Sequence, residues 1–325
     1  MNMAKRKYSK MKKIEPSVQT FTFLLTSQDA GKETNYIDLS QCASILNRRF
    51  YRQGLNWAVS SFKVLSGTGV TGQVSIQKLP NTWVMSNSWE KGFRAWKKQQ
   101  DIAIEENESV KAKFNDFKIF MNEDHLGGGF SRNLLPYSSA TLANPVQEAA
   151  PGEWEASQIV IPNFVTVGTN YEPFVQAVGD DVGGVGGSIS LIKAYADSRS
   201  VPQSPDPLVP TDVIGPENIY RAMFDTGMNM EDVMDNVVGK NDELPYPQLD
   251  YPGGDTQLSS LEIHDQEFIT GTTIGGTTRL KGGNFPCGLI EVATFGIARD
   301  ETISIQVNLV PGHHRGYLCE PMTEM

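Results

Sequence analysis

The segment from Glu301 to Pro311 constrains the fold of this chain more than any other. Isoleucine, valine and leucine alternate in it with threonine, serine, glutamine and asparagine. Successive side chains of a β-strand point to opposite faces of a sheet, so the pattern predicts a strand with one buried and one solvent-facing side. A strand needs hydrogen-bonding neighbours, and this one stands near the end of the 325-residue sequence. We therefore expect earlier strands to form the sheet that it completes.

Comparable patterns predict further strands along the chain. With the strand at 301–309 they make eight, at residues 18–26, 55–65, 72–79, 114–121, 154–161, 188–196 and 286–298. Residues 261–270 are expected to be extended as well. Strands and helices do not alternate as βαβ units, which favours an antiparallel sandwich. Eight strands in two sheets are typical of a jelly roll. The predicted fold class is all-β, an eight-stranded antiparallel jelly-roll sandwich with one helix after the third strand and a long loop and helix insertion before the last two strands.

The strongest helical pattern covers Ser88 to Glu106. Trp89, Phe93 and Trp96 recur there at helical spacing and form one apolar stripe, with Ser88 as the candidate N-cap. We expect the stripe to pack against the sheets as core.

Several segments are expected to be irregular. Residues 28–53 and 271–278 lack a clear period. Residues 200–259 are rich in proline and form a predicted surface insertion, with short helices over 217–224 and 230–238. Loops this long within a compact domain are usually functional.

Residues 67–72 match the pattern GxGxxG. In dinucleotide-binding proteins that motif opens a helix whose N-terminus meets a pyrophosphate. Here a predicted strand follows, so we interpret the glycines as a hairpin loop that needs positive φ.

The basic residues are unevenly distributed. The chain has a net charge of −10, yet its first thirteen residues hold no acid and these six cations: Lys5, Arg6, Lys7, Lys10, Lys12 and Lys13. We predict a disordered basic arm over residues 1–14 and one domain over residues 15–325. Such an arm can neutralise phosphates or act as a short nuclear-import signal; a purely solubilising tail is the alternative.

A second basic cluster lies in the predicted irregular region. Arg48, Arg49 and Arg52 surround Phe50 and Tyr51. Interleaved arginines and aromatic rings can bind nucleic acid by charge and stacking. The same composition also suits an ordinary surface on which long side chains cover apolar groups.

Catalytic and metal-binding motifs are absent from the sequence. Cys42, Cys287 and Cys319 are too far apart for a metal-binding pair and are expected to be reduced thiols. Asp180 and Asp181 are weak candidates for a cation site. No run of apolar residues approaches the ~20 needed to span a bilayer, and no apolar segment follows the charged start of the chain, so we expect neither a membrane span nor a signal peptide.

The four histidines offer little chemistry. His264 and Asp265, near Glu267, could form an acid–base pair, but no nucleophile accompanies them. Adjacent His313 and His314 suit a surface or interface role. These observations favour a protein that is not an enzyme and that needs no cofactor.

Two segments, together with the basic arm and the strand count, resemble a known family. They are Lys78-Leu79-Pro80-Asn81-Thr82-Trp83 and Leu309-Val310-Pro311-Gly312-His313-His314-Arg315-Gly316-Tyr317. The chain resembles the capsid proteins of small circular single-stranded DNA viruses that encode a replication initiator. The resemblance implies a single jelly roll, a homo-oligomeric shell of 60 or more copies, and a DNA genome held on its inner surface. The arm of this chain is short and has six cations, whereas many related proteins carry long arginine-rich arms.

The resemblance also implies a place and partners. A capsid protein belongs to the virion and passes through the host nucleus during assembly, and its surface loops contact a host receptor. Nucleic acid would be bound by the six cations of the arm and by Arg48, Arg49 and Arg52, without sequence preference. The alternative function is a jelly-roll glycan-binding or attachment module that uses residues 200–259, for which a basic arm has no evident use.

Overall fold

The computed structural model describes residues 15–28, 30–107, 109, 116–139, 147–162, 168–184, 186–200, 251–254, 261–271 and 276–325. Most of its strand residues belong to two antiparallel sheets. Sheet A has the strand order β1-β14-β3-β12, with the short β17 beside one end of β3, and sheet B has the order β11-β4-β13-β2. Their bounds are β1 Thr20–Thr26, β2 Lys32–Asp38, β3 Leu55–Ser66, β4 Gly72–Lys78, β11 Glu262–Ile269, β12 Thr277–Phe285, β13 Leu289–Phe295, β14 Thr302–Leu309 and β17 Cys319–Pro321.

The long strands pair in a nested order. The first, β1, pairs with the last, β14, and β2 pairs with β13. Moving inward along the chain, β3 pairs with β12 and β4 with β11. Successive strands such as β13 and β14 therefore lie in different sheets, and the turn between them crosses the edge of the sandwich.

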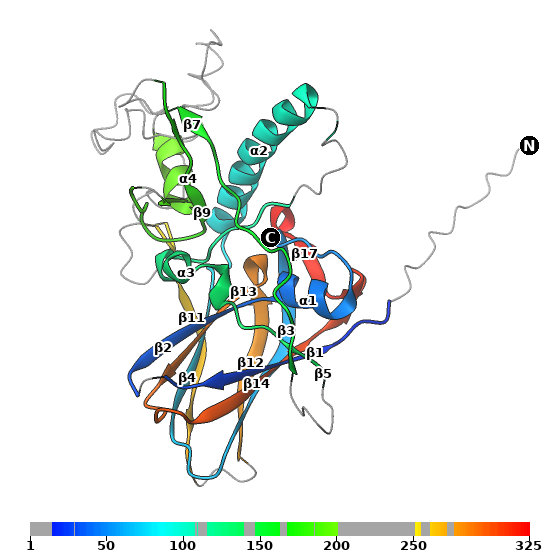
Figure 1. Ribbon diagram of the computed structural model, residues 1–325, viewed down its shortest axis with the longest axis vertical. Coiled ribbons are helices and arrows are strands. Elements are labelled where there is room, and N and C mark those ends of the chain that lie inside the picture. Colours follow the sequence, from blue (N-terminus) through cyan, green and yellow to red (C-terminus); the bar gives the residue numbers. More distant parts are fainter. Residues whose placement is uncertain are drawn as a thin grey trace, which may run out of the picture.

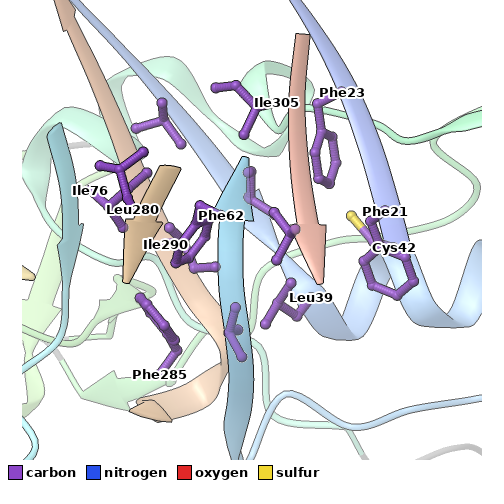
Figure 2. Close-up of a cluster of buried hydrophobic side chains, with 14 of the residues drawn as sticks. Phe21, Phe23, Leu39, Cys42, Phe62, Ile76, Leu280, Phe285, Ile290 and Ile305 are labelled. Atoms are coloured by element: carbon purple, nitrogen blue, oxygen red, sulfur yellow. The ribbon is translucent and has the colours of Figure 1, made fainter. Parts of the chain in front are cut away.

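One hydrophobic core fills the space between the sheets. Phe21, Phe62 and Leu280 point inward from sheet A, and Ile76 and Ile290 point inward from sheet B; all are buried. Figure 2 shows these side chains meeting between the strands. Burial of such side chains is the main favourable term in folding, at roughly 1.5–3 kcal/mol for each large apolar group. The predicted alternation of β14 is confirmed, because Ile303, Ile305, Val307 and Leu309 are its buried residues.

Three predicted strands are wrong. Of the predicted strand 114–121, the described residues 116–121 contain only an isolated bridge at Phe120. Phe117, Ile119 and Met121 are nevertheless buried as expected. Residues 154–161 contain only a bridge at Gln158 and the start of the two-residue strand β7. Each segment is extended but has no long neighbour with which to form a ladder.

The third is the segment 188–196. Only β10, Ser188–Ser190, is a strand, and the helix α4, Leu191–Ser200, follows it directly. Leu191, Ile192 and Ala194 are its buried residues. On a strand Leu191 would point away from Ile192 and Ala194, whereas one face of a helix can hold all three. The predicted strand followed the alternation of Ile189, Leu191 and Tyr195 instead.

Two elements occupy the region 28–53 that was expected to be irregular. They are β2, an edge strand of sheet B, and the helix α1, Leu39–Asn47. The prediction missed β2 because its sequence, KETNYID, is polar over most of its length. The prediction also missed β12. This strand begins within the predicted loop 271–278, and it contains Gly282 and Gly283, which are uncommon in strands.

The glycine-rich loop at 67–71 has the predicted positive φ, at Gly69 (φ 90°), but it is not a hairpin. The strands that it joins, β3 and β4, belong to different sheets. The loop therefore carries the chain from sheet A to sheet B.

The chain between β4 and β11 forms a second body of structure. It contains α2 Trp83–Glu106, α3 Glu123–Gly128, β5 Tyr137–Ser139, β6 Gln147–Glu148, β7 Ile161–Pro162, β8 Asn170–Tyr171, β9 Phe174–Gln176, β10 and α4. Figure 1 shows α2 and α4 beyond one end of the sheets. Their apolar side chains share a second core with residues at the ends of sheet B strands, among them Leu79 and Leu289. The predicted helices at 217–224 and 230–238 lie outside the described residues.

The helix α2 begins earlier than its sequence pattern indicated. Thr82 caps it, with its Oγ1 accepting a hydrogen bond from the Met85 amide at 3.4 Å. Ser88 lies inside the helix and donates to the Met85 carbonyl. Trp89 and Trp96 are buried, which confirms that the aromatic stripe is core. The three cysteines are free thiols, as predicted.

His125 joins the second body to sheet B. It is fully buried, and its ring stacks on that of Tyr36 in β2 at a centroid distance of 4.2 Å. Its Nδ1 accepts from the Met121 amide at 3.1 Å, and its Nε2 lies 2.8 Å from Asn133 Oδ1. The ring is therefore neutral, with the proton on Nε2. Burial lowers the pKa of His125 to about 4, against the hydrogen bond to Asn133, which raises it.

The low pKa of His125 predicts a pH-dependent effect of replacing it. In the unfolded chain His125 is protonated below about pH 6.5, whereas in the folded chain it is protonated only below about pH 4. The free energy of unfolding therefore falls by about 3 kcal/mol as the pH is lowered through that range. At pH 7.5, His125→Phe should cost about 1–3 kcal/mol through the lost hydrogen bonds. The deficit should shrink toward pH 4.5, because phenylalanine binds no proton. Urea denaturation of both proteins at the two pH values measures it; a deficit independent of pH would contradict the assignment.

Candidate nucleic-acid interface

Three segments distant in sequence meet at the start of β1. Residues 15–19 lead into that strand, residues 48–52 follow α1, and residues 313–317 belong to the hairpin of β15, Pro311–Gly312, and β16, Gly316–Tyr317. Hydrogen bonds join all three. Gln19 Nε2 donates to the Gly316 carbonyl at 3.2 Å, and Tyr51 Oη donates to the Arg315 carbonyl at 2.9 Å. Arg315 Nη1 donates to the carbonyl of Phe50.

The junction gathers four arginines, which we call the arginine corner: Arg48, Arg49, Arg52 and Arg315. Arg48, Arg52 and Arg315 are exposed, and Arg49 is partly exposed. Arg49 Nη1 pairs with Glu15 Oε2 at 3.1 Å. Burial raises the pKa of Tyr51, and the charges of Arg49 and Arg315 oppose that rise. The positive charges of two separate segments therefore act on one phenol.

The fold holds this corner through α1. The N-cap residue Asp38 is buried, and its Oδ1 accepts from the amides of Ser40 and Gln41 at 2.9 and 3.2 Å. Its Oδ2 accepts from Gln53 Nε2 at 3.1 Å and Trp154 Nε1 at 3.0 Å. Burial raises the pKa of Asp38 to about 6, against these four bonds, which lower it. Asp38 thus fixes the start of α1 and, through Gln53, the chain just beyond Arg52.

Two of the arginines occupy left-handed backbone conformations. Arg48 has φ 54° at the C-cap of α1, and Arg315 has φ 50° in the turn between β15 and β16. Helices commonly end on glycine or asparagine in this conformation, because other residues adopt it at a cost of about 1–2 kcal/mol. Such strain is typical of functional positions.

The aromatic residues of the corner differ in what they can contact. Tyr51 is fully buried, so its ring is not accessible to a base. Its ring packs instead against Trp57, His314 and Tyr317. Phe50 is partly exposed, and the guanidinium of Arg52 lies 5.9 Å from its ring centroid.

The structure places Arg48, Arg49 and Arg52 together, as their sequence spacing requires, and adds Arg315. Arg315 is distant from the other three in the sequence, where it belongs to the segment 309–317, and no local pattern joins it to this cluster. The six cations predicted to bind nucleic acid in the arm lie outside the described residues: Lys5, Arg6, Lys7, Lys10, Lys12 and Lys13.

The weak metal candidates Asp180 and Asp181 form ion pairs instead. Lys193 Nζ lies 2.7 Å from Asp180 Oδ1 and 3.3 Å from Asp181 Oδ2. The hydrogen bond from Lys193 lowers the pKa of Asp180, whereas burial raises that of Asp181. Within the part of the chain that the structure describes, no three histidine, cysteine, aspartate or glutamate side chains gather as metal ligands.

The remaining histidine candidates have structural contacts. His264 Nε2 lies 3.1 Å from the Lys281 carbonyl, and Asp265 Oδ2 accepts from the Lys281 amide at 2.8 Å. The side chains of His264 and Asp265, both on β11, thus occupy hydrogen-bonding groups on the free edge of β12. This can prevent a further strand from pairing there. His313 is exposed and His314 partly exposed, both in the hairpin of the corner.

Comparison with protein families, with curated proteins and with solved structures finds no match to this chain. None of the helices in the described ranges is long and apolar enough to cross a membrane.

Proposed function

We propose that this chain is a viral capsid protein, without enzymatic activity, whose single jelly roll self-assembles into an icosahedral shell and packages single-stranded DNA. The observation that carries the proposal is the nested strand pairing. In a jelly roll, eight strands form two sheets by folding pairs of distant strands over one another. The pairs β1 with β14, β2 with β13, β3 with β12 and β4 with β11 fit that scheme.

Exposed apolar groups on an edge strand support assembly from copies of the chain. On β11, one of the two edge strands of sheet B, Phe268 is 68% exposed and Ile263 62% exposed. Large exposed apolar side chains on a sheet edge are typical of contacts with another protein. In the proposed shell, a second copy covers them.

The distribution of charge supports a polyanionic cargo. The arm carries six cations, and the structured part of the chain that follows it begins beside the arginine corner. Sixty copies would bring together about 360 arm charges, each of which can neutralise a phosphate and release a counterion. Binding of this kind is independent of sequence and strongly dependent on salt. The proposed setting is the virion, with passage through the host nucleus during assembly.

The test of the proposal is assembly of the purified chain. Negative-stain images should show closed shells of uniform size, and an absorbance ratio at 260 and 280 nm should show nucleic acid within them. Monomers at every salt concentration and pH would overturn the proposal. A monodisperse protein that binds a glycan array would favour the attachment module instead.

The strained arginine of α1 offers a test of the corner. Asparagine adopts the left-handed conformation more readily than arginine, so Arg48→Asn should not lower the melting temperature. It should lower the affinity for an oligothymidylate about fivefold near 0.1 M salt, the effect of one lost phosphate contact. The matched control is Asp300→Asn, at another left-handed position (φ 64°) in the turn between β13 and β14. Equal affinities for Arg48→Asn and the parent would exclude Arg48 from the interface.

A further inference from the structure

The outward face of sheet A has an unusual composition. The strand register aligns its outward side chains in three straight rows across β1, β14, β3 and β12. The rows are Thr20-Asn308-Ser61-Lys281, Thr22-Gln306-Lys63-Arg279 and Leu24-Ser304-Leu65-Thr277. None of these positions holds a carboxylate, although the chain has 38 acidic residues.

Three cations lie close together on this face: Lys63, Arg279 and Lys281. Arg279 and Lys281 are exposed, and Lys63 is partly exposed. Asp265 of β11 is a carboxylate close to these cations. It accepts a hydrogen bond from the backbone amide of Lys281. Among the described residues, none of the three cations has a side-chain ion pair.

Two of the cations oppose each other directly. Lys63 of β3 and Arg279 of β12 are cross-strand partners in the register. Like charges directly opposite on neighbouring strands destabilise a sheet. A sequence selected only for the stability of this sheet would place an acid or a neutral residue at one of the two positions, so the pair favours a role in binding an anion.

The face is continuous with the other basic elements of the chain. The row that holds Lys281 begins at Thr20, the first residue of β1. Residues 15–19 lead into that strand from the arginine corner, and the basic arm precedes them. Sheet B differs, because its outward rows contain the exposed Phe268 and Ile263 and the acidic Glu291.

We propose that the outward face of sheet A is a binding surface for the phosphate backbone of single-stranded nucleic acid, with Lys63, Arg279 and Lys281 as its phosphate contacts. The inference rests on the proposed function and adds an orientation to it. In the shell, sheet A faces the packaged strand, and the edge strand β11 of sheet B, with the exposed Phe268 and Ile263, lies toward neighbouring copies. The first two rows place hydroxyl and amide groups beside the cations, from Thr20, Ser61, Asn308, Thr22 and Gln306.

The test replaces each cation by threonine, a residue that suits an exposed strand position. Oligothymidylate binding to the full chain is followed by fluorescence anisotropy over a range of salt. Each of Lys63→Thr, Arg279→Thr and Lys281→Thr should lower the affinity about fivefold near 0.1 M salt, and the triple variant about a hundredfold. The control is Lys32→Thr, which removes an exposed lysine from the outward face of sheet B and should leave the affinity unchanged.

Each other outcome has a definite meaning. Unchanged affinity in the single and triple variants, or an equal loss with Lys32→Thr, would overturn the surface. If the triple variant no longer forms shells but binds the oligonucleotide with normal affinity, this face contacts a second copy of the chain. That result also overturns the proposed binding surface. If the parent protein forms nucleic-acid-filled shells and the triple variant does so equally, the surface fails and the proposed function stands. If the parent neither assembles nor binds, the proposed function itself fails.

The folding of the variants is checked by their melting temperatures. Removing one member of the Lys63–Arg279 pair should leave the melting temperature unchanged or raise it, because the like-charge contact is lost. A binding loss accompanied by a fall in melting temperature would identify a folding defect and overturn the assignment for that residue.

Discussion

Replacing Gly282 with alanine is expected to destabilise the protein by about 4 kcal/mol or more, one of the largest effects that a single methyl group can have. Gly282 lies in β12, between Lys281, the cross-strand partner of Ser61, and Gly283, the partner of Val59. A Cβ atom at this position would lie closer than 3.0 Å to the backbone carbonyl oxygens of both Val59 and Ser60, a separation that real Cβ atoms essentially never show. Backbone atoms in the middle of a sheet cannot move aside without breaking the ladder between β3 and β12. Urea denaturation followed by tryptophan fluorescence measures the loss.

Two neighbouring substitutions serve as controls. At Gly283, a Cβ would meet the ring of His264 at 2.6 Å, and that side chain can rotate away, so Gly283→Ala should cost much less. At Gly67, in the loop between the sheets, the nearest atom would be Val70 Cγ2 at 3.8 Å, an ordinary contact. Gly67→Ala should therefore change the stability by less than about 0.5 kcal/mol. Equal stability of the Gly282→Ala and Gly67→Ala proteins would disprove the close approach of β12 to β3.

In the proposed capsid, removal of residues 1–13 is expected to empty the shells of most of their nucleic acid while leaving the sandwich folded. Six lost cations should reduce the slope of log affinity against log salt by about 4 and the affinity near 0.1 M salt by about 10⁴-fold. The core of the sandwich is formed by residues from Phe21 onward, so the melting temperature should not change. Salt titration of oligothymidylate binding and the absorbance ratio of purified particles measure the effect.

A variant of full length separates charge from chain length. Glutamine in place of all six basic residues keeps the arm and removes its charge, and it should behave like the deletion. If the glutamine variant packages nucleic acid normally and the deletion does not, the arm acts through its length. Unchanged packaging by both variants would show that the arm is not the site of genome binding.

Local pattern was sufficient for the strands that have one buried and one exposed face. The alternation of Phe21 and Phe23 in β1 and of Ile303 and Ile305 in β14 identified both strands and their inward residues. The aromatic stripe of α2 was identified in the same way. These predictions succeeded because the side-chain period of a strand or helix depends only on its own backbone geometry.

The same reasoning failed where local pattern was weak or ambiguous. The polar edge strand β2 needs hydrogen bonds on only one side, and its sequence shows no alternation. In β12, Gly282 and Gly283 are locally unfavourable for a strand, and only the nearness of β3 and of His264 explains them. In α4, the alternation of Leu191 and Tyr195 indicated a strand, but the adjacent Leu191 and Ile192 are both buried, which a helix allows.

The arginine corner shows that local sequence pattern was also insufficient to identify the whole candidate site. The sequence placed Arg48, Arg49 and Arg52 together because they are neighbours in the chain. It could not add Arg315, which reaches them only when the hairpin of β15 and β16 packs on Tyr51.

The sequence by itself determined that this chain forms an antiparallel β structure with a buried aromatic helix and a basic leading segment. Tertiary structure alone decided which strands are neighbours, and therefore that Lys63 lies opposite Arg279 among outward rows of β1, β14, β3 and β12 that hold no carboxylate. The physical reason is that a strand's own side chains fix which way each residue points, whereas its partner and register are set by hydrogen bonds and packing with segments hundreds of residues away.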